Sequence, residues 1–265
     1  MLAGFFFMLA LPSFLIASPE AVYVTLSETP SQSIYVHWIE KTQKYPSLLY
    51  QKPGDMVWKE IDVLYRNPLE SSPYYACCLK ISNLEPSSYY SFYLNGDSTS
   101  YVFKTLPKDL SAPLKVAIGG DLTESFSLFR RMNKVVAAKN PDFAILGGDI
   151  AYSNGYGLIG GKRGSISRWV SFFSTWQKTM RGDRDRLIPI VATLGNHDVG
   201  SIDRKEGGEK AFYLKLFCPY AKVGFRTLDI AKAVSFFLLD SGHLSSVESQ
   251  VPWLQESLAK RKDRL

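Results

Sequence analysis

Three segments of the sequence place a polar side chain that can bind a metal directly after a glycine. These are Gly120-Asp121, Gly148-Asp149 with Tyr152 three residues further on, and Gly195-Asn196-His197-Asp198. Carboxylate, amide and phenol oxygens are hard donors, which suit hard metal cations. A glycine before each donor lets the chain turn sharply and lets a substrate or metal approach the backbone. These residue types therefore indicate metal chemistry.

Each of the three segments ends an apolar run that predicts a buried strand, at residues 113–121, 142–149 and 186–198. Because ligands bind outside the carboxyl ends of strands in open α/β sheets, we expect the polar side chains to converge in one crevice. A carboxylate such as Asp149 can bridge two cations about 3.5 to 4 Å apart, and such a pair activates water and clamps a phosphate. One Gly-Asp after a strand more often forms a turn or a helix cap, but three in order favour a metal site.

A glycine-rich loop follows the second segment and resembles two nucleotide-binding motifs. Residues 155–160 match GxGxxG but lie several residues past the strand end, so we reject them as a cofactor site. Gly161-Lys162 lacks the remaining residues of a P-loop. We interpret the loop as a rim whose basic residues, with others beyond the next helix, either attract a phosphate ester or form a solvated surface. These basic residues are Lys162, Arg163, Arg181, Arg184 and Arg186.

The elements before these segments are short and β-rich. Six or seven alternating runs lie between residues 21 and 105, and turn signals separate them about every ten residues, which predicts a β-sandwich. Trp38 is expected in the core, and Tyr89 or Tyr90 is expected to form a tyrosine corner after the turn at 83–86. His37 lies in the same predicted strand as Trp38, and we assign it no functional role.

A proline-containing joint at residues 106–113 separates this region from a different pattern, and we place a domain boundary near residue 110. Predicted strands then alternate with helices expected at 125–140, 165–180 and 251–260, and a further strand is expected at 233–240. This alternation predicts an α/β domain with a largely parallel, buried sheet.

The composition supports a folded protein with one or two domains. The 265 residues are 46% hydrophobic and 21% charged, which excludes disorder as the main state. The net charge of +6 favours anionic partners without the basicity of a nucleic-acid-coating protein, and we expect no nucleic-acid partner. Three cysteines cannot form a disulfide framework or a four-thiolate zinc site.

The first residues indicate export. Residues 2–17 are apolar apart from Pro12 and Ser13, which is typical of a secretory leader, and we assign residues 1–18 to a signal peptide. The run is shorter than the roughly 20 residues that span a bilayer. We therefore expect a secreted or periplasmic protein with no stable membrane partner beyond the leader. The alternative is an uncleaved anchor, because no Lys or Arg precedes the apolar run.

The three glycine-led segments, behind a predicted sandwich that ends at residues 101–107, resemble the purple acid phosphatases of the binuclear metallophosphoesterase superfamily. The resemblance extends from about residue 20 to the end of the chain. It implies a fibronectin-III-like domain at 19–109 and a metallophosphoesterase domain at 110–265. The latter would supply half of a four-layer α/β/β/α sandwich.

The resemblance also assigns roles to single residues. Asp121 and Tyr152 resemble ligands of a ferric ion, and Asp149 resembles the carboxylate that bridges the two metals. Asn196 resembles a ligand of the divalent ion, which is zinc, manganese or iron in that family. His197 resembles the outer-sphere catalytic histidine that contacts the phosphate and the leaving group.

Several features depart from the family pattern. Thr123 stands where the family commonly has glycine, so the turn after Asp121 is open to question. The family takes three more histidine ligands from later motifs, Val-x-x-His and Gly-His-x-His, which this sequence does not contain. His243 resembles the last motif only in part, because Ser245 stands where the second ligand would be, and we interpret it as a loop residue.

We therefore expect the domain to be truncated and its activity to be at most a small fraction of a complete enzyme's. We also expect strands 143–146 and 234–239 to expose apolar faces that an oligomer or a missing C-terminal segment would cover. The expected reaction is hydrolysis of phosphate monoesters, with a phosphate ester as substrate. The alternatives are a phosphodiesterase or nucleotidase of the same superfamily, or a non-catalytic exported binding protein with a degenerate domain.

Overall fold

A computed structural model describes residues 18–42, 44–63, 65–154, 165–200, 211–217 and 223–264 of the protein. Residues 1–17 of the predicted leader and the glycine-rich loop with Lys162 and Arg163 lie outside the described residues. Within the described ranges, no helix is both long enough and apolar enough to cross a bilayer.

The N-terminal region is rich in strands, as the sequence predicts. Its strands are β1 (Ala21–Leu26), β2 (Ile34–Glu40), β3 (Ser47–Gln51), β4 (Lys59–Asp62), β5 (Tyr65–Pro68), β6 (Tyr75–Ile81), β7 (Tyr89–Leu94) and β8 (Tyr101–Lys104). One antiparallel sheet has the order β4-β3-β7-β8, and β5-β6-β2-β1 pair in another. Trp38 is fully buried between them, and the hydroxyl of Tyr90 accepts a hydrogen bond from the backbone N–H of Glu85 at 2.9 Å.

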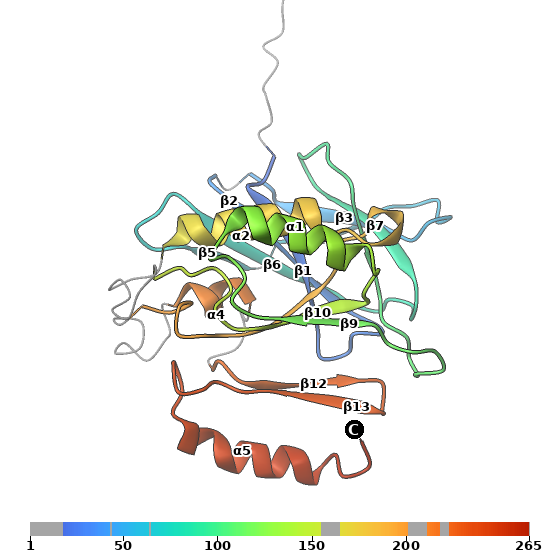
Figure 1. Ribbon diagram of the computed structural model, residues 1–265. Coiled ribbons are helices and arrows are strands. Elements are labelled where there is room, and N and C mark those ends of the chain that lie inside the picture. The colour runs from blue at the N-terminus through green and yellow to red at the C-terminus, as the bar shows by residue number, and fades with distance from the viewer. Residues whose placement is uncertain are drawn as a thin grey trace, which may run out of the picture.

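An α/β unit follows the joint. It contains β9 (Val116–Gly119), α1 (Phe126–Ala137), β10 (Phe143–Gly147), α2 (Ile166–Thr179), the short 3-10 helix η1 (Asp183–Asp185), β11 (Ile190–Thr193) and α4 (Phe212–Phe217). β10 pairs in parallel with β9 on one side and with β11 on the other. Helices α1 and α2 cover one face of these strands (Figure 1). Their inward residues include Phe129, Trp169 and Trp176, which are nearly fully buried.

The two regions share a sheet, which the sequence did not predict. Strand β1 pairs with β11 through Thr25 and Ile190, so a seven-stranded sheet runs in the order β5-β6-β2-β1-β11-β10-β9. The side chain of Gln177 in α2 accepts a hydrogen bond from the backbone N–H of Val22 at 2.7 Å. Helix α2 therefore packs on strands from both regions.

The C-terminal elements differ from the expected parallel sheet. Strands β12 (Arg226–Ile230) and β13 (Val234–Leu238) form a separate antiparallel hairpin, and α5 (Val247–Ala259) follows it. Figure 1 shows the hairpin below the central sheet and α5 below the hairpin. Within the described residues, these two strands thus pair with each other and not with the central sheet.

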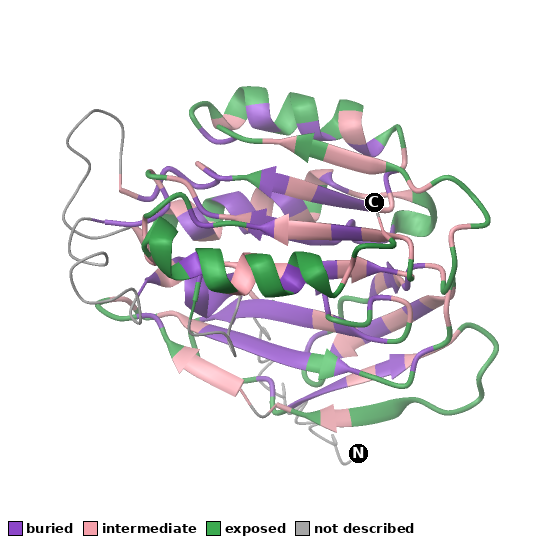
Figure 2. Cartoon of the chain, turned by 90° about the horizontal axis from the view of Figure 1, so that it is seen from below, coloured by how far each residue is buried: buried purple, intermediate pink, exposed green. Residues whose placement is uncertain are grey.

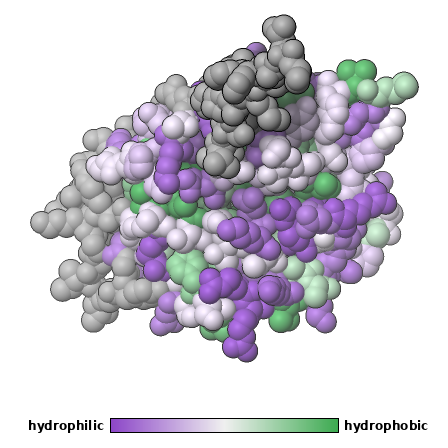
Figure 3. Space-filling model, turned by 90° about the horizontal axis from the view of Figure 1, so that it is seen from above, coloured by the Kyte–Doolittle hydropathy of each residue, from purple (hydrophilic) through white to green (hydrophobic). Residues whose placement is uncertain are grey.

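The hairpin also corrects the expectation of an exposed strand face at 143–146. Phe143 and Leu146 are buried, and Phe143 packs in one cluster with Leu228 and Leu238 of the hairpin. The strands of the sheets are mostly buried while the helices expose one face (Figure 2). In the view from above, hydrophilic side chains cover much of the surface, with smaller hydrophobic patches between them (Figure 3).

The three arginines beyond α2 bind protein groups rather than forming a phosphate-attracting rim. Arg186 is buried and pairs with Asp183 at 2.8 Å, and the Arg184 guanidinium lies 4.4 Å from the centroid of the Tyr89 ring. Arg181 donates to the carbonyl oxygens of residues 177 and 185 at 2.6 and 3.0 Å. They precede β11 and so lie at its amino end, whereas the predicted ligands follow the carboxyl ends of the strands. Of the two alternatives, attraction of a phosphate ester or a solvated surface, the position of these arginines does not favour the first.

Candidate metal centre

The parallel strands β9, β10 and β11 bring the three glycine-led segments to one edge of the sheet. Leu146 of β10 lies opposite Gly119 of β9, and Gly147 lies opposite Thr193 of β11. The loops beyond these positions bond to one another, because the backbone N–H of Leu122 donates to the carbonyl of Asp149 at 3.0 Å. The loops that hold the predicted ligands therefore lie side by side, as do the strands that they follow.

Two glycines are required where the second and third loops cross. Gly148 has a φ of +98°, and a Cβ built on it would lie 2.8 Å from the backbone nitrogen of Gly195. A Cβ on Gly195 would in turn collide with the side chain and backbone of Asp149. The glycines before Asp149 and Asn196 therefore permit a close approach of two backbones.

Three of the predicted ligands have left-handed backbone conformations. The φ angles are +53° at Asp121, +50° at Asp149 and +49° at Tyr152. Such conformations cost about 1 to 3 kcal/mol each for residues other than glycine, and they concentrate at functional sites. The surrounding loop contacts must therefore hold these residues in place.

Asp121 and Tyr152 present their oxygens to each other. The Tyr152 hydroxyl donates to Asp121 Oδ1 at 2.9 Å. Burial raises the pKa of Tyr152 above its ordinary value, and the carboxylates of Asp121, Asp149 and Glu124 raise it further. Negative charge therefore accumulates around the phenol, and a cation could replace its proton between the two oxygens. This donor pair fits a hard cation such as Fe(III).

Asp149 and Asn196 belong to loops that touch each other. The backbone N–H of His197 donates to Asp149 Oδ1 at 2.8 Å, which places the third loop beside the second. Asn196 is exposed, and its carbonyl accepts from the side chain of Asn154 at 2.8 Å. The residues assigned to the divalent ion therefore lie on adjoining loops and offer a carboxylate and an amide, which suit a hard divalent cation.

His197 is held between Tyr152 and Asn154. Its ring stacks on Tyr152 with 4.7 Å between centroids, and its Nδ1 lies 2.9 Å from Asn154 Oδ1. Asn154 Nδ2 donates to the carbonyls of Asn196 and Val199 at 2.8 and 3.1 Å, so Oδ1 is the atom that faces the imidazole. An amide oxygen only accepts, which means that Nδ1 carries a proton.

Asp198 bonds to the backbone of the two loops that carry Asp149 and Asn196. It is buried and accepts hydrogen bonds from the N–H groups of Ile150, Ala151 and Gly195 at 2.8, 3.1 and 3.0 Å. Burial raises the pKa of Asp198 to about 7, although these hydrogen bonds act in the opposite direction. The third residue of the Asn-His-Asp segment is therefore an internal brace between two loops.

Thr123 stabilises the turn after Asp121, although the family pattern commonly has glycine at this position. Its side chain is fully buried and donates to the carbonyl of Ile150 at 2.8 Å. The hydroxyl therefore ties the turn after Asp121 to the second loop. The turn is built with threonine in place of glycine.

Glu124 and Asn154 were not predicted from the sequence. Glu124 lies three residues after Asp121, and it contributes to the charge around Tyr152. Asn154 lies two residues after Tyr152, and its contact with His197 depends on the crossing of two loops. A search for polar residues within a few positions of each predicted ligand would have found both.

His243 lies in the loop after β13, as expected. Its backbone N–H donates to Asp240 Oδ1 at 2.7 Å, and the same carboxylate accepts from the N–H groups of Leu244 and Ser245 at 2.8 and 2.6 Å. Within the described part of the chain, no group of three His, Cys, Asp or Glu side chains could hold a metal. The candidate donor set instead consists of two carboxylates, a phenol and an amide.

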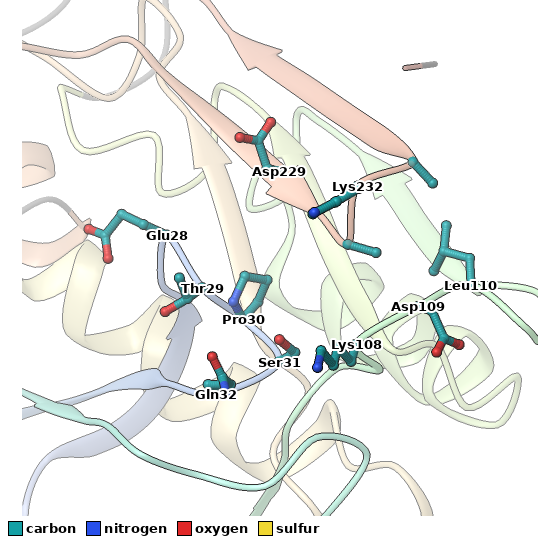
Figure 4. A pocket seen from close by; sticks show the side chains of 12 residues that line it. Glu28, Thr29, Pro30, Ser31, Gln32, Lys108, Asp109, Leu110, Asp229 and Lys232 are labelled. Carbon is teal, nitrogen blue, oxygen red and sulfur yellow. The ribbon is translucent and has the colours of Figure 1, made fainter. Parts of the chain in front are cut away.

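A cavity of about 640 Å³ lies away from these loops, where three turns meet. It is lined by residues 28–32, 108–110, 229 and 231–233. Figure 4 shows Lys108 and Lys232 on different segments that border it. None of the predicted ligands lines it, so its volume does not bear on the candidate centre.

Comparisons with known proteins agree with the metal-binding interpretation at the level of the family. The model of a family described as calcineurin-like phosphoesterase matches residues 114–264. Among solved structures, the sensor domain of the anti-sigma factor RsgI4 in Pseudobacteroides cellulosolvens is 23% identical, over 34% of this chain and 97% of that chain. Its TM-score of 0.22 does not indicate a shared fold. No curated protein matches the chain.

Proposed function

This chain belongs to the calcineurin-like phosphoesterase family, which supports phosphoester hydrolysis, and we propose that it is a phosphate monoesterase of the purple acid phosphatase type. One observation carries the finer assignment. The Tyr152 hydroxyl lies 2.9 Å from a carboxylate oxygen of Asp121, so a phenol and a carboxylate face the same point. In the purple acid phosphatases that the sequence resembles, a tyrosine phenolate on Fe(III) gives the purple colour and distinguishes them from plain metallophosphoesterases.

In this proposal, side chains of the three loops would hold two metals. Asp121 and Tyr152 would hold Fe(III), Asp149 would bridge, and Asn196 would hold zinc, manganese or iron. Such a pair supplies an activated water and neutralises the charge of the phosphate. The strained backbone at Asp121, Asp149 and Tyr152 supports this assignment, because it shows that the fold enforces the positions of these three residues.

His197 has the geometry of an acid for the leaving group. Asn154 occupies its Nδ1 at 2.9 Å, so the proton that moves during reaction belongs to Nε2. The stacking on Tyr152 keeps the imidazole beside the proposed ferric ligands. To act as this acid the imidazole must also carry a proton at Nε2, which would pass to the departing alcohol oxygen and leave the neutral Nδ1–H ring. We also propose that the enzyme is exported, which the apolar run at residues 2–17 supports.

The test is to load the purified chain with iron and zinc and to measure hydrolysis of p-nitrophenyl phosphate. We expect metal-dependent turnover that Asp149→Asn abolishes, and a visible absorption band that Tyr152→Phe removes. Tyr93→Phe is the matched control, because Tyr93 lies in the sandwich against Trp58. Iron binding without any Tyr152-dependent band would contradict the purple acid phosphatase assignment.

The same preparation separates the alternatives. A diester, bis-p-nitrophenyl phosphate, would be the better substrate of a phosphodiesterase, and a nucleoside monophosphate that of a nucleotidase. Metal binding with no turnover of any of these esters would favour a non-catalytic binding protein. Turnover that reaches the level of a complete family member would contradict the expectation of weak activity.

A further inference from the structure

One arginine of helix α2 bonds to the backbones of two ligand loops. Arg168 Nε donates to the carbonyl of Ala151 at 2.7 Å, and its Nη2 donates to the carbonyl of Thr123 at 2.6 Å. Thr123 lies two residues after Asp121, and Ala151 lies between Asp149 and Tyr152. A single guanidinium thus joins the loops that carry three of the predicted ligands.

The arginine is itself anchored in a rigid part of the fold. The next residue, Trp169, is fully buried, and Phe173 one turn further stacks on Tyr23 of β1 with 3.7 Å between ring centroids. The guanidinium carbon lies 5.2 Å from the centroid of the Phe126 ring at the start of α1. Motion of Arg168 relative to the sheet is therefore opposed by packing on two sides.

The bonded carbonyls are next to the strained residues. Asp121 and Tyr152 have positive φ angles, and each lies within two residues of a carbonyl that Arg168 holds. Left-handed conformations persist only where surrounding contacts determine them. Two charge-assisted hydrogen bonds from one planar group fix both the distance and the orientation of the two loops.

We propose that Arg168 is a positioning residue that clamps the two loops so that Asp121 and Tyr152 face the same cation. Its Nε and Nη2 donate to protein carbonyls, so its role differs from that of an arginine that binds the substrate phosphate directly. The inference rests on the proposed function, because that function supplies the metal. The two hydrogen bonds of Arg168 that form the clamp are nevertheless made in the metal-free chain. The two parts can therefore be tested separately.

The experiment compares Arg168→Met and Arg168→Lys with a matched control, Arg181→Met. Arg181 lies just after the other end of α2 and also donates to two backbone carbonyls, at 2.6 and 3.0 Å, but these are remote from the ligand loops. The first measurement is hydrogen exchange of the metal-free full chain. We expect Arg168→Met to speed exchange at the Leu122 amide and at residues 150–152 about 10-fold or more. Arg181→Met should leave these amides unchanged.

The second measurement is the affinity for Mn²⁺ by calorimetry. Loss of a residue that orients ligands lowers metal affinity by about 10- to 100-fold. We expect a loss of this size in Arg168→Met, a smaller loss in Arg168→Lys because an ammonium can still reach one carbonyl, and none in Arg181→Met.

The outcomes separate the two hypotheses. Unchanged exchange in both Arg168 variants would overturn the clamp, whatever the metal result. Faster exchange in a chain that binds no metal even as wild type would support the clamp and contradict the proposed function. If Arg168→Met does not fold, hydrogen exchange is measured in Arg168→Lys instead. Equal protection in Arg168→Lys and wild type would then contradict the proposal that hydrogen bonds to both carbonyls are required.

Discussion

The side-chain oxygen of Asn154 lies 2.9 Å from His197 Nδ1, while the nitrogen of the same amide donates to the carbonyls of Asn196 and Val199. Two carbonyl acceptors determine the orientation of the amide, and the amide then determines which imidazole nitrogen carries a proton. The tautomer of His197 thus depends on a contact between two loops that follow different strands.

Replacing this amide by a carboxylate tests its effect on His197. In Asn154→Asp a carboxylate oxygen would still accept the hydrogen bond from Nδ1–H, so we expect His197 to keep the Nδ1–H tautomer. NMR of the His197 ring nitrogens across pH measures this directly. The Asn154→Leu variant, which removes both hydrogen bonds, should show a mixture of tautomers at neutral pH. A single Nδ1–H tautomer in that variant would contradict the assignment.

Gly195 tests the crossing of the second and third loops. In Gly195→Ala the new methyl group collides with Asp149, so we expect the free energy of unfolding to fall by about 1 to 3 kcal/mol. We also expect metal affinity to fall, because relief of the collision must move Asp149, the carboxylate that we propose as the bridge. Gly119→Ala is the control, since its Cβ would lie 3.6 Å from Leu122, an ordinary contact. Equal stability of the two variants by urea denaturation would exclude the proposed crowding.

The sequence predicted that the three glycine-led segments lie together, because their signals are local. A glycine, a donor and a preceding apolar strand lie within ten residues of one another, and parallel pairing then brings the three loops together. The pairing of β9 with β10 brings the segments of Asp121 and Tyr152 to the same edge of the sheet. Asn154 and Arg168 escaped prediction because their partners lie on other elements, and neither residue type is unusual where it stands.

The larger architecture was less predictable for a similar reason. The run at 233–240 has the composition of a buried strand, but composition does not determine whether its partner is parallel or antiparallel. The β12–β13 hairpin buries Leu238 against Phe143, which a parallel strand in the central sheet would also have done. The pairing of Thr25 with Ile190 joins residues far apart in the chain, and no local pattern encodes it.

His37 gives a prediction for the dependence of stability on pH. It is buried beneath Tyr23, with Thr25 Oγ1 at 2.8 Å from Nε2. Burial lowers the pKa of His37 to about 3, and Arg226 acts in the same direction. As the pH falls through about 6.5, the unfolded chain therefore binds a proton at His37 and the folded chain does not. The free energy of unfolding consequently falls as the pH drops below this value.

We expect this histidine to lower the free energy of unfolding by about 2 kcal/mol between pH 7 and pH 5. His37→Phe should remove this part of the pH dependence, although it also leaves Thr25 without its partner. Urea denaturation of both proteins at the two pH values gives the slope of the free energy of unfolding against pH for each protein. The difference between the two slopes does not depend on the absolute stability of the variant. Parallel slopes would show that His37 takes up a proton as readily in the folded chain as in the unfolded chain, which would contradict this prediction.

The shared sheet predicts that the two regions unfold together. Gln177 Oε1 accepts the Val22 amide at 2.7 Å, and Tyr23 stacks on Phe173, so β1 contacts α2 through both backbone and side chain. In Gln177→Leu the Val22 amide loses its acceptor while it stays buried, which costs about 1 to 3 kcal/mol. Gln255→Leu on the exposed face of α5 is the control and should change stability little. We expect Gln177→Leu to shift hydrogen-exchange protection in β1, α2 and β11 by the same amount, because they belong to one cooperative unit. Loss of protection confined to the N-terminal strands would show that the two regions are independent despite the sheet they share.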